Sequence, residues 1–215
     1  MNEDAHRVGL RLNELLVAEG LEPLDCSLAG RFGDYCLLLI RWNSRVNLTA
    51  IRGEEGILSR HFVESIACAR RLPAGIGTLL DFGSGAGFPG IPIALCRPEI
   101  AVTLAESQGK KAAFLQEAVR VVGVEALVHS RRAENLAAQF DCVTMRAVDR
   151  MQEAVKAAAR LVKRGGWLVP MTTGTEVEKL RAALGAEFSW RNVVALPGGE
   201  DRVLALAQRM VSWPV

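Results

Sequence analysis

Cysteine, histidine and aromatic residues are scarce in this 215-residue sequence. It holds five cysteines, three histidines, one tyrosine and only 6% aromatic residues. The cysteines lie far apart, and the sequence has no C-x-x-C pair and no grouping of cysteine with histidine. Neither a disulfide framework nor a zinc site is therefore indicated. We expect reduced, mostly buried thiols and no bound metal.

Long apolar runs are also missing. The first ten residues, MNEDAHRVGL, are too polar for a signal peptide, and no apolar run is long enough to span a bilayer. The net charge of +2 excludes a histone-like polycation but leaves room for a local basic face. Half of the residues are apolar, which is enough for one sizeable core. We expect a cytoplasmic monomer that does not associate with membranes.

The pattern of apolar residues changes near Gly77. Apolar residues recur at helical spacing over 4–20, 25–42 and 54–72, which predicts a helical extension over residues 1–73. Residues 74–215 alternate instead between strand-like and helix-like runs, which is typical of parallel βαβ units. The expected strands are 78–82, 101–106, 126–130, 140–147 and 166–172, and the expected helices between and after them are 109–122, 149–163 and 175–184.

Two consecutive strand-like runs close the sequence, at 190–196 and 202–208, and PGGED turns between them. A short turn of this kind predicts an antiparallel hairpin. A dinucleotide-binding domain would instead be expected to continue with a helix and a strand. We therefore predict an α/β fold with a seven-stranded, mostly parallel sheet and a C-terminal antiparallel hairpin. This is the Rossmann-like fold of class I methyltransferases that use S-adenosylmethionine (AdoMet).

A glycine-rich turn follows the first predicted strand. Asp81 precedes Gly83, Gly85 and Gly87 in the pattern D-x-G-x-G-x-G, and a helix opens directly afterwards. Glycines let the backbone turn sharply and approach a ligand, and free N–H groups at the helix start favour polar ligand groups. Gly85 and Gly87 with Gly90 also satisfy G-x-G-x-x-G, the dinucleotide pattern. The turn alone therefore admits either AdoMet or a nicotinamide cofactor.

Two carboxylates flank this turn. Glu106 ends the next strand, where a carboxylate can accept hydrogen bonds from both ribose hydroxyls, but both cofactors contain a ribose. Asp81 favours AdoMet, because a carboxylate there would repel a pyrophosphate and suits the ammonium of a methionine moiety. The alternative is a glycine-rich turn that binds no ligand.

Other candidate site residues follow later strands, whose carboxyl ends meet at the ligand crevice of such sheets. Phe88 follows the glycines and either packs on the cofactor or only anchors the helix. Ala133 and Glu134 are expected near the adenine, unless Glu134 merely opens a helix. Arg146 ends an apolar strand, where it needs an anion: the methionine carboxylate, a substrate phosphate or a structural glutamate. His61, a lone histidine in the third helix, is expected to be structural.

Several motifs in order resemble the RsmG (glucose-inhibited division protein B) family. They are WNSRVNLTAI at 42–51, RHFVES at 60–65, LLDFGSGAGFPGIPIAL at 79–95, LAESQGKKAAFL at 104–115, RRAEN at 131–135 and FDCVTMRA at 140–147. The resemblance extends from about residue 35 to the C-terminus. The segment GSGAGFPGIP with its KK-x-x-FL helix is its most specific part.

The resemblance implies a bacterial enzyme that methylates guanine N7 in the 530 loop of 16S ribosomal RNA, at position 527 in the usual rRNA numbering. The family's cofactor contacts would fall on Gly83, Phe88, the Ala133–Glu134 pair and Arg146, with Glu106 and Ser107 at the ribose end. The partner would be 16S rRNA, the small ribosomal subunit or its assembly intermediate.

The sequence departs from the family pattern at two places on the presumed RNA side. Thr173 precedes Gly174 where the family usually has lysine, and Val203 follows Arg202 where the family often has histidine. Basic residues expected to include phosphate contacts are Arg41, Arg45, Lys110, Lys111, Arg131, Arg132, Lys163 and Arg164.

Two other functions compete with this interpretation. A nicotinamide-dependent oxidoreductase would use Gly85, Gly87 and Gly90, but with Tyr35 as the only tyrosine the sequence has no Tyr-Lys or His-Asp catalytic set. A non-catalytic ribosome- or RNA-binding module would need no intact cofactor turn. Guanine N7 carries a free lone pair at neutral pH, so its methylation needs no general base. We accordingly expect Arg146 to act by positioning.

Overall fold

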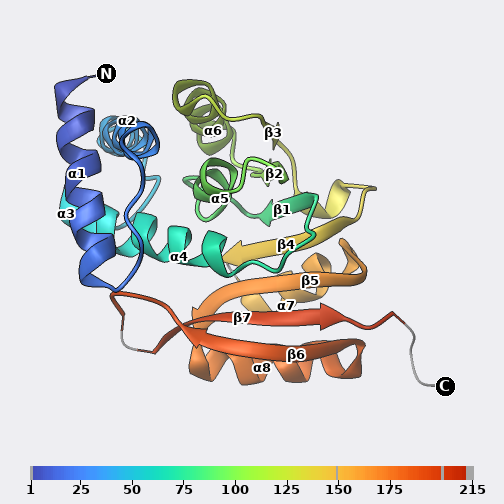
Figure 1. Ribbon diagram of the computed structural model, residues 1–215. Coiled ribbons are helices and arrows are strands. Elements are labelled where there is room, and N and C mark those ends of the chain that lie inside the picture. Colours follow the sequence, from blue (N-terminus) through green and yellow to red (C-terminus); the bar gives the residue numbers. More distant parts are fainter. Residues whose placement is uncertain (1, 149, 200, 212–215) are drawn as a thin grey trace.

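The computed structural model describes residues 2–148, 150–199 and 201–211. A seven-stranded sheet runs through the molecule, with helices packed on both of its faces (Figure 1). The strand order is β3-β2-β1-β4-β5-β7-β6. Strands β1 to β5 are parallel, whereas β7 runs antiparallel to both β5 and β6. The predicted fold, including the C-terminal hairpin, is confirmed.

The strands begin and end close to the predicted positions. Their bounds are β1 Thr78–Phe82, β2 Ala101–Ala105, β3 Ala126–His129, β4 Phe140–Arg146, β5 Val162–Thr173, β6 Phe188–Ala195 and β7 Arg202–Arg209. β5 starts earlier than expected, because Val162 already pairs with Phe140 at the start of β4. The preceding helix, α7, therefore ends at Arg160 and not at 163.

Alternating apolar side chains give the sheet two buried faces. Leu79, Cys142 and Val169 belong to one hydrophobic cluster, whereas Leu80 and Val143 belong to the other. Successive residues of a strand point to opposite faces, so a strand covered on both sides is apolar throughout. This explains why the strands are near-continuous apolar runs in the sequence.

Helices on the first face include the predicted N-terminal ones. They are α2 Cys26–Asn43, α4 Glu64–Arg71, α5 Gly90–Cys96 and α6 Gly109–Val122, and their apolar residues form one cluster with the sheet. The second face carries α7 Met151–Arg160 and α8 Gly174–Leu184. Thr173 accepts a hydrogen bond from the Glu176 N–H and so caps α8. None of the helices in the described ranges is both long and apolar enough to cross a membrane.

The third predicted helix is not a uniform α-helix. It comprises α3 Glu54–Ile57, a wider π-helical segment η1 at Leu58–Val63, and then α4. π-Helical turns are rare and often occur at functional sites. Sequence periodicity does not reveal such a segment, because the apolar spacing changes by only one residue. Here η1 contains Arg60 and His61, which both lie near the cavity described below.

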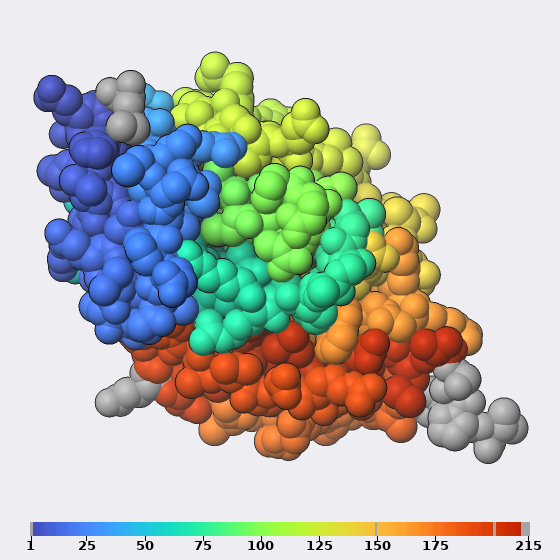
Figure 2. All heavy atoms as spheres, in the orientation of Figure 1, coloured from blue at the N-terminus to red at the C-terminus, as the bar shows by residue number. Residues whose placement is uncertain are grey.

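Helix α1 Glu3–Ala18 packs on α2 at very close range. A Cβ atom added to Gly33 would overlap the Ala5 carbonyl group, and one added to Gly9 would overlap Ala29. Glycine at these two positions therefore allows the helix backbones to approach each other. In Figure 2 the N-terminal helices, in blue, lie directly against the green α5–α6 region and reach down to the red C-terminal hairpin.

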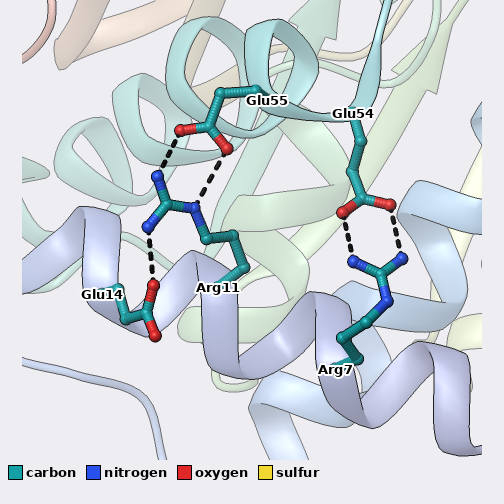
Figure 3. Close-up of polar contacts among 5 residues, drawn as sticks. All are labelled: Arg7, Arg11, Glu14, Glu54 and Glu55. Atoms are coloured by element: carbon teal, nitrogen blue, oxygen red, sulfur yellow. Dashed lines mark hydrogen bonds and ion pairs between the residues drawn. The ribbon is translucent and has the colours of Figure 1, made fainter.

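Ion pairs link the outer side of α1 to α3. Arg7 binds Glu54 through two hydrogen bonds of 2.7 and 2.8 Å, and Arg11 bridges Glu55 and Glu14 (Figure 3). These side chains are exposed, apart from the partly buried Glu54, so solvent and salt weaken their attraction. Their forked geometry nevertheless fixes the orientation of α1 relative to the segment that leads into η1.

Gly33→Ala tests the close contact between α1 and α2. The added methyl group must displace the α1 backbone, so we expect the free energy of unfolding to fall by about 1–3 kcal/mol. Gly109→Ala is the matched control, since no atom lies within 4 Å of its added Cβ. Urea titrations would measure both variants, and equal stability of the two would contradict the packing described here.

Candidate functional site

A cavity of about 860 Å³ opens at the carboxyl ends of β1, β2 and β4. The predicted site residues that line it come from four different loops or strand ends. They are Gly83, Gly85, Phe88, Glu106, Ser107, Ala133, Glu134 and Arg146. The topology therefore brings together residues that are more than sixty positions apart in the sequence.

The glycine loop adopts backbone conformations that favour glycine. Gly83, Gly85 and Gly87 have φ angles of +71°, +57° and +89°. Ser84 stabilises the turn, since its N–H donates to the Ala105 carbonyl group and its own carbonyl accepts from the Gly87 N–H. Gly83 and Gly85 face the cavity, whereas Gly87 lies toward the core, where an added Cβ would meet Ile91 and the Tyr35 hydroxyl. Glycine at positions 83 and 85 therefore keeps the cavity open, whereas glycine at position 87 is required by the packing of the core.

Asp81 lies behind the cavity wall, outside the lining residues. Its carboxylate accepts hydrogen bonds from the Gly90 N–H at 3.1 Å and from the Thr144 hydroxyl at 3.2 Å. Burial raises its pKa to about 6, although both hydrogen bonds act in the opposite direction. Asp81 therefore helps to hold the start of α5. The residues that line the cavity separate it from the position where an ammonium group was expected.

Glu106 lies on the opposite side of the glycine loop from β1. One oxygen accepts from the Gly85 N–H at 3.0 Å and the other from the Gln108 N–H at 2.8 Å. An ionised carboxylate can accept about four hydrogen bonds, so each oxygen retains a free lone pair. Because the side chain is only 7% exposed and lines the cavity, its orientation is fixed before any ligand arrives.

A cluster of three aromatic side chains packs against the core side of the glycine loop. Tyr35 of α2 donates a hydrogen bond to the Ala86 carbonyl group, and its ring stacks on Phe88 at 5.2 Å. Phe62 meets both rings edge to face. Phe88 is therefore both a core residue and a cavity-lining residue. Sequence analysis missed Tyr35, because a lone tyrosine on a helix gives no signal of its position under a loop fifty residues later.

His61 was expected to be only structural, yet it lines the cavity. Its ring stacks on Phe88 with centroids 4.8 Å apart, and its Nε2 atom lies 2.7 Å from the Thr49 hydroxyl. Burial, followed by the nearby arginines Arg146, Arg202 and Arg60, lowers the pKa of His61 to about 3. The imidazole is therefore neutral throughout the physiological range. Only η1 brings it to this position, which explains why the sequence did not indicate it.

Arg146 forms an ion pair with a structural glutamate and also lines the cavity. Its Nη2 atom lies 3.1 Å from the Glu64 carboxylate and donates to the Arg60 carbonyl group at 2.6 Å. Burial lowers the pKa of Arg146 to about 10, and the charge of Glu64 partly opposes this effect. Of the three anions considered from the sequence, the structural glutamate is present.

Three of the eight predicted basic residues line the cavity. They are Lys111, Arg131 and Arg132, and Arg150, which was not predicted, lines it too. Lys163, by contrast, lies at the opposite end of the sheet, near the start of β5, and pairs with Asp141 there. The cavity rim is therefore basic, and its floor is formed by the glycine loop and the two neutral rings of Phe88 and His61.

The depressed pKa of His61 predicts a loss of stability in acid. Between pH 6.5 and about 3, the unfolded chain binds a proton at His61 that the folded protein does not, so stability falls as the pH falls. From pH 7.5 to 5.5, we expect the wild type to lose about 1 kcal/mol more than His61→Phe, which keeps the stacked ring. Urea titrations at each pH would measure this, with exposed His6→Asn as the control. If stability changed with pH equally in the wild type and in His61→Phe, the lowered pKa of His61 would be contradicted.

Comparison with known proteins adds independent findings. The family model described as GidB, rRNA small subunit methyltransferase G, matches residues 29–196. A protein from Roseiflexus sp. named ribosomal RNA small subunit methyltransferase G is 38% identical over 200 residues, which cover 87% of this chain and 86% of that protein. A protein of the same name from Xanthomonas euvesicatoria is 40% identical over 194 residues, covering 87% and 90% of the two chains.

Solved structures with similar folds are also methyltransferases. Magnesium protoporphyrin IX methyltransferase from Synechocystis, solved with bound AdoMet, has a TM-score of 0.58 at 16% identity and covers 82% of this chain and 97% of its own. An AdoMet-dependent methyltransferase from Aquifex aeolicus has a TM-score of 0.56 at 16% identity, covering 72% and 93%. These two share the fold. The match to the family model and the sequence identity to the Roseiflexus and Xanthomonas proteins show that this chain belongs to the GidB family, rRNA small subunit methyltransferase G.

Proposed function

We propose that the protein transfers a methyl group from AdoMet to guanine N7 in the 530 loop of 16S ribosomal RNA. The observation that carries this proposal is the preformed cavity between the glycine loop and Glu106, in a chain that belongs to an rRNA methyltransferase family. The names of its relatives support the small-subunit rRNA as substrate. The resemblance in sequence motifs supplies the guanine N7 position.

In this proposal AdoMet lies along the cavity, between the glycine loop and Glu106. Gly83 and Gly85 leave room for the backbone to approach the amino-acid end, and Glu106 offers acceptor sites to the ribose hydroxyls. Ser107 follows Glu106 at the ribose end, and Ala133 with Glu134 would hold the adenine. Phe88 would cover one side of the cofactor. Asp81 would act on it through the backbone of the loop and α5.

The chemistry requires few catalytic groups. AdoMet supplies an electrophilic methyl group, and guanine N7 has a free lone pair, so no residue needs to remove a proton. The residues of this chain would align the two reactants, and such positioning can contribute roughly 7–11 kcal/mol. Arg146, fixed by Glu64 and the Arg60 carbonyl group, would be the main positioning residue at the cavity.

The neutral state of His61 suits this reaction. Guanine N7 reacts through its free lone pair, so the reaction needs no imidazole that carries or transfers a proton. Burial, followed by the nearby arginines, keeps the imidazole of His61 neutral. A nicotinamide-dependent oxidoreductase is not favoured, because Gly85 and Glu106 suit either cofactor, whereas the matching family and the two similar solved structures are methyltransferases. A non-catalytic RNA-binding module would not need a carboxylate fixed at this position.

Glu106→Gln tests the cofactor site. The amide retains the shape but loses the charge and one acceptor oxygen, so we expect AdoMet affinity to fall by about 10- to 100-fold. Isothermal titration calorimetry would measure it, with exposed Glu99→Gln as the control and NADH as the competing ligand. Tight NADH binding, or unchanged AdoMet binding by Glu106→Gln, would refute this assignment.

The acceptor is tested by locating the methyl group. Purified protein with methyl-labelled AdoMet is expected to convert one guanine of 16S rRNA to 7-methylguanine, detected by nuclease digestion and mass spectrometry. Without a general base, turnover is expected to be flat between about pH 6.5 and 8.5. Label on another atom or nucleotide would disprove the N7 assignment, and turnover rising tenfold per pH unit would disprove the proposed chemistry.

A further inference from the structure

A cluster of charged side chains lies behind the cavity, where three chain segments meet. Its centre is Glu64, at the start of α4, whose side chain is fully buried. Arg60 from η1 donates to one carboxylate oxygen at 3.0 Å. Arg202 from β7 donates to the other oxygen at 2.9 Å, and Arg146 from β4 lies 3.1 Å from the same atom. We refer to these four residues as the Glu64 cluster.

The Glu64 cluster carries more positive than negative charge. Three guanidinium groups share one carboxylate, although the side chains of Arg146 and Arg202 are only 7% and 24% exposed. Burying a cation is costly unless an anion accompanies it. The other buried carboxylates are Asp81 and Glu106, and neither forms an ion pair with these arginines within the described residues. Within the residues described, the cluster therefore lacks a second anion.

Hydrogen-bond donors without partners also indicate that the Glu64 cluster lacks an anion. The Nη1 atom of Arg146 and the Nε atom of Arg202 are buried and have no hydrogen-bond partner within the described residues. Buried donors of this kind usually have a partner, and leaving one unpaired costs about 1–3 kcal/mol. Both belong to forked guanidinium groups, whose geometry suits carboxylate or phosphate oxygens. Two such donors on adjacent arginines are therefore suited to bind one oxyanion.

The charge of the reactants distinguishes between possible anions. AdoMet has one carboxylate but also an ammonium and a sulfonium group, so its net charge is +1. Its arrival would increase the positive charge beside the Glu64 cluster. A phosphodiester of RNA brings one negative charge and no positive one. An RNA phosphate would therefore reduce the excess positive charge of the Glu64 cluster, whereas the cofactor would not.

We propose that the Glu64 cluster is a phosphate-binding subsite that holds an RNA phosphate next to the target guanine, with Arg202 and Arg146 as its donors. The proposal rests on the proposed function, because it takes ribosomal RNA as the ligand. Arg146 lines the cavity, and Arg202 extends the cluster toward the C-terminal hairpin. A phosphate bound there would fix the nucleotide relative to the glycine loop. Glu64 would hold the arginines in place when no RNA is present.

Arg202→Gln is the decisive variant, since Glu64 keeps two arginine partners in it. We expect affinity for deproteinised 16S rRNA to fall about tenfold at 0.1 M salt, and the slope of log affinity against log salt to decrease by about one unit. Arg202→Lys retains the charge and should retain the slope. Arg191→Gln is the matched control, because this exposed arginine of the same hairpin has a side-chain hydrogen bond to Gln208, lies outside the Glu64 cluster and should leave the slope unchanged.

Calorimetry with AdoMet distinguishes an RNA phosphate from the methionine carboxylate of AdoMet as the anion that the cluster binds. Unchanged AdoMet affinity in Arg202→Gln, together with the reduced salt slope, supports the phosphate subsite. Weakened AdoMet affinity with an unchanged salt slope would overturn it in favour of the methionine carboxylate, and no change in either would also overturn it. RNA binding is measured without methyl transfer. A correct salt slope in a protein that methylates no guanine N7 would therefore contradict the proposed function and not the subsite.

Discussion

The buried carboxylate of Glu64 is the interaction on which the arrangement of the site depends. It joins η1, the end of β4 and the start of β7 through Arg60, Arg146 and Arg202. A buried ion pair contributes little net stability, because the desolvation of both charges offsets their attraction. Its value here is geometric, since it fixes three segments that have no backbone pairing with one another at this point. Removing the carboxylate would leave three arginines facing each other and would loosen η1 from the sheet, in which β5 still pairs with both β4 and β7.

The same charges determine the protonation state of the cavity. Asp81 and His61 are both buried, but their pKa values shift in opposite directions, to about 6 and to about 3. In each case burial is the first cause and disfavours the charged form, so the aspartate holds its proton more tightly and the histidine loses it more easily. The arginines then lower both values. At pH 7 the imidazole of His61 is therefore neutral, whereas the carboxylate of Asp81 and the guanidinium of Arg146 remain charged.

The sequence predicted the fold because its signals are local. Apolar runs, the Asp81–Gly87 turn and the terminal PGGED turn each depend on a few neighbouring residues, and alternating strands and helices then indicate a parallel sheet with right-handed crossovers. Most cavity-lining loops were predictable for the same reason, since they follow strands, although residues 48–50 lie between two helices. Other features depend on contacts between distant segments. The π-helical geometry at His61, the place of Tyr35 under Ala86 and the convergence on Glu64 have no pattern in any short window. For Asp81 the position in the sequence was clear, but its hydrogen bonds to Gly90 and Thr144 were not.

The hydrogen bond from Tyr35 to Ala86 has a consequence for how this protein can be divided. The glycine loop rests on a helix from the N-terminal extension, so residues 74–215 alone would lose the support beneath the loop. Exposing Phe88 and the rest of that apolar surface would also favour aggregation. The N-terminal helices are thus an internal part of the site, and a change in this extension could be transmitted to the glycine loop without touching a single residue that lines the cavity.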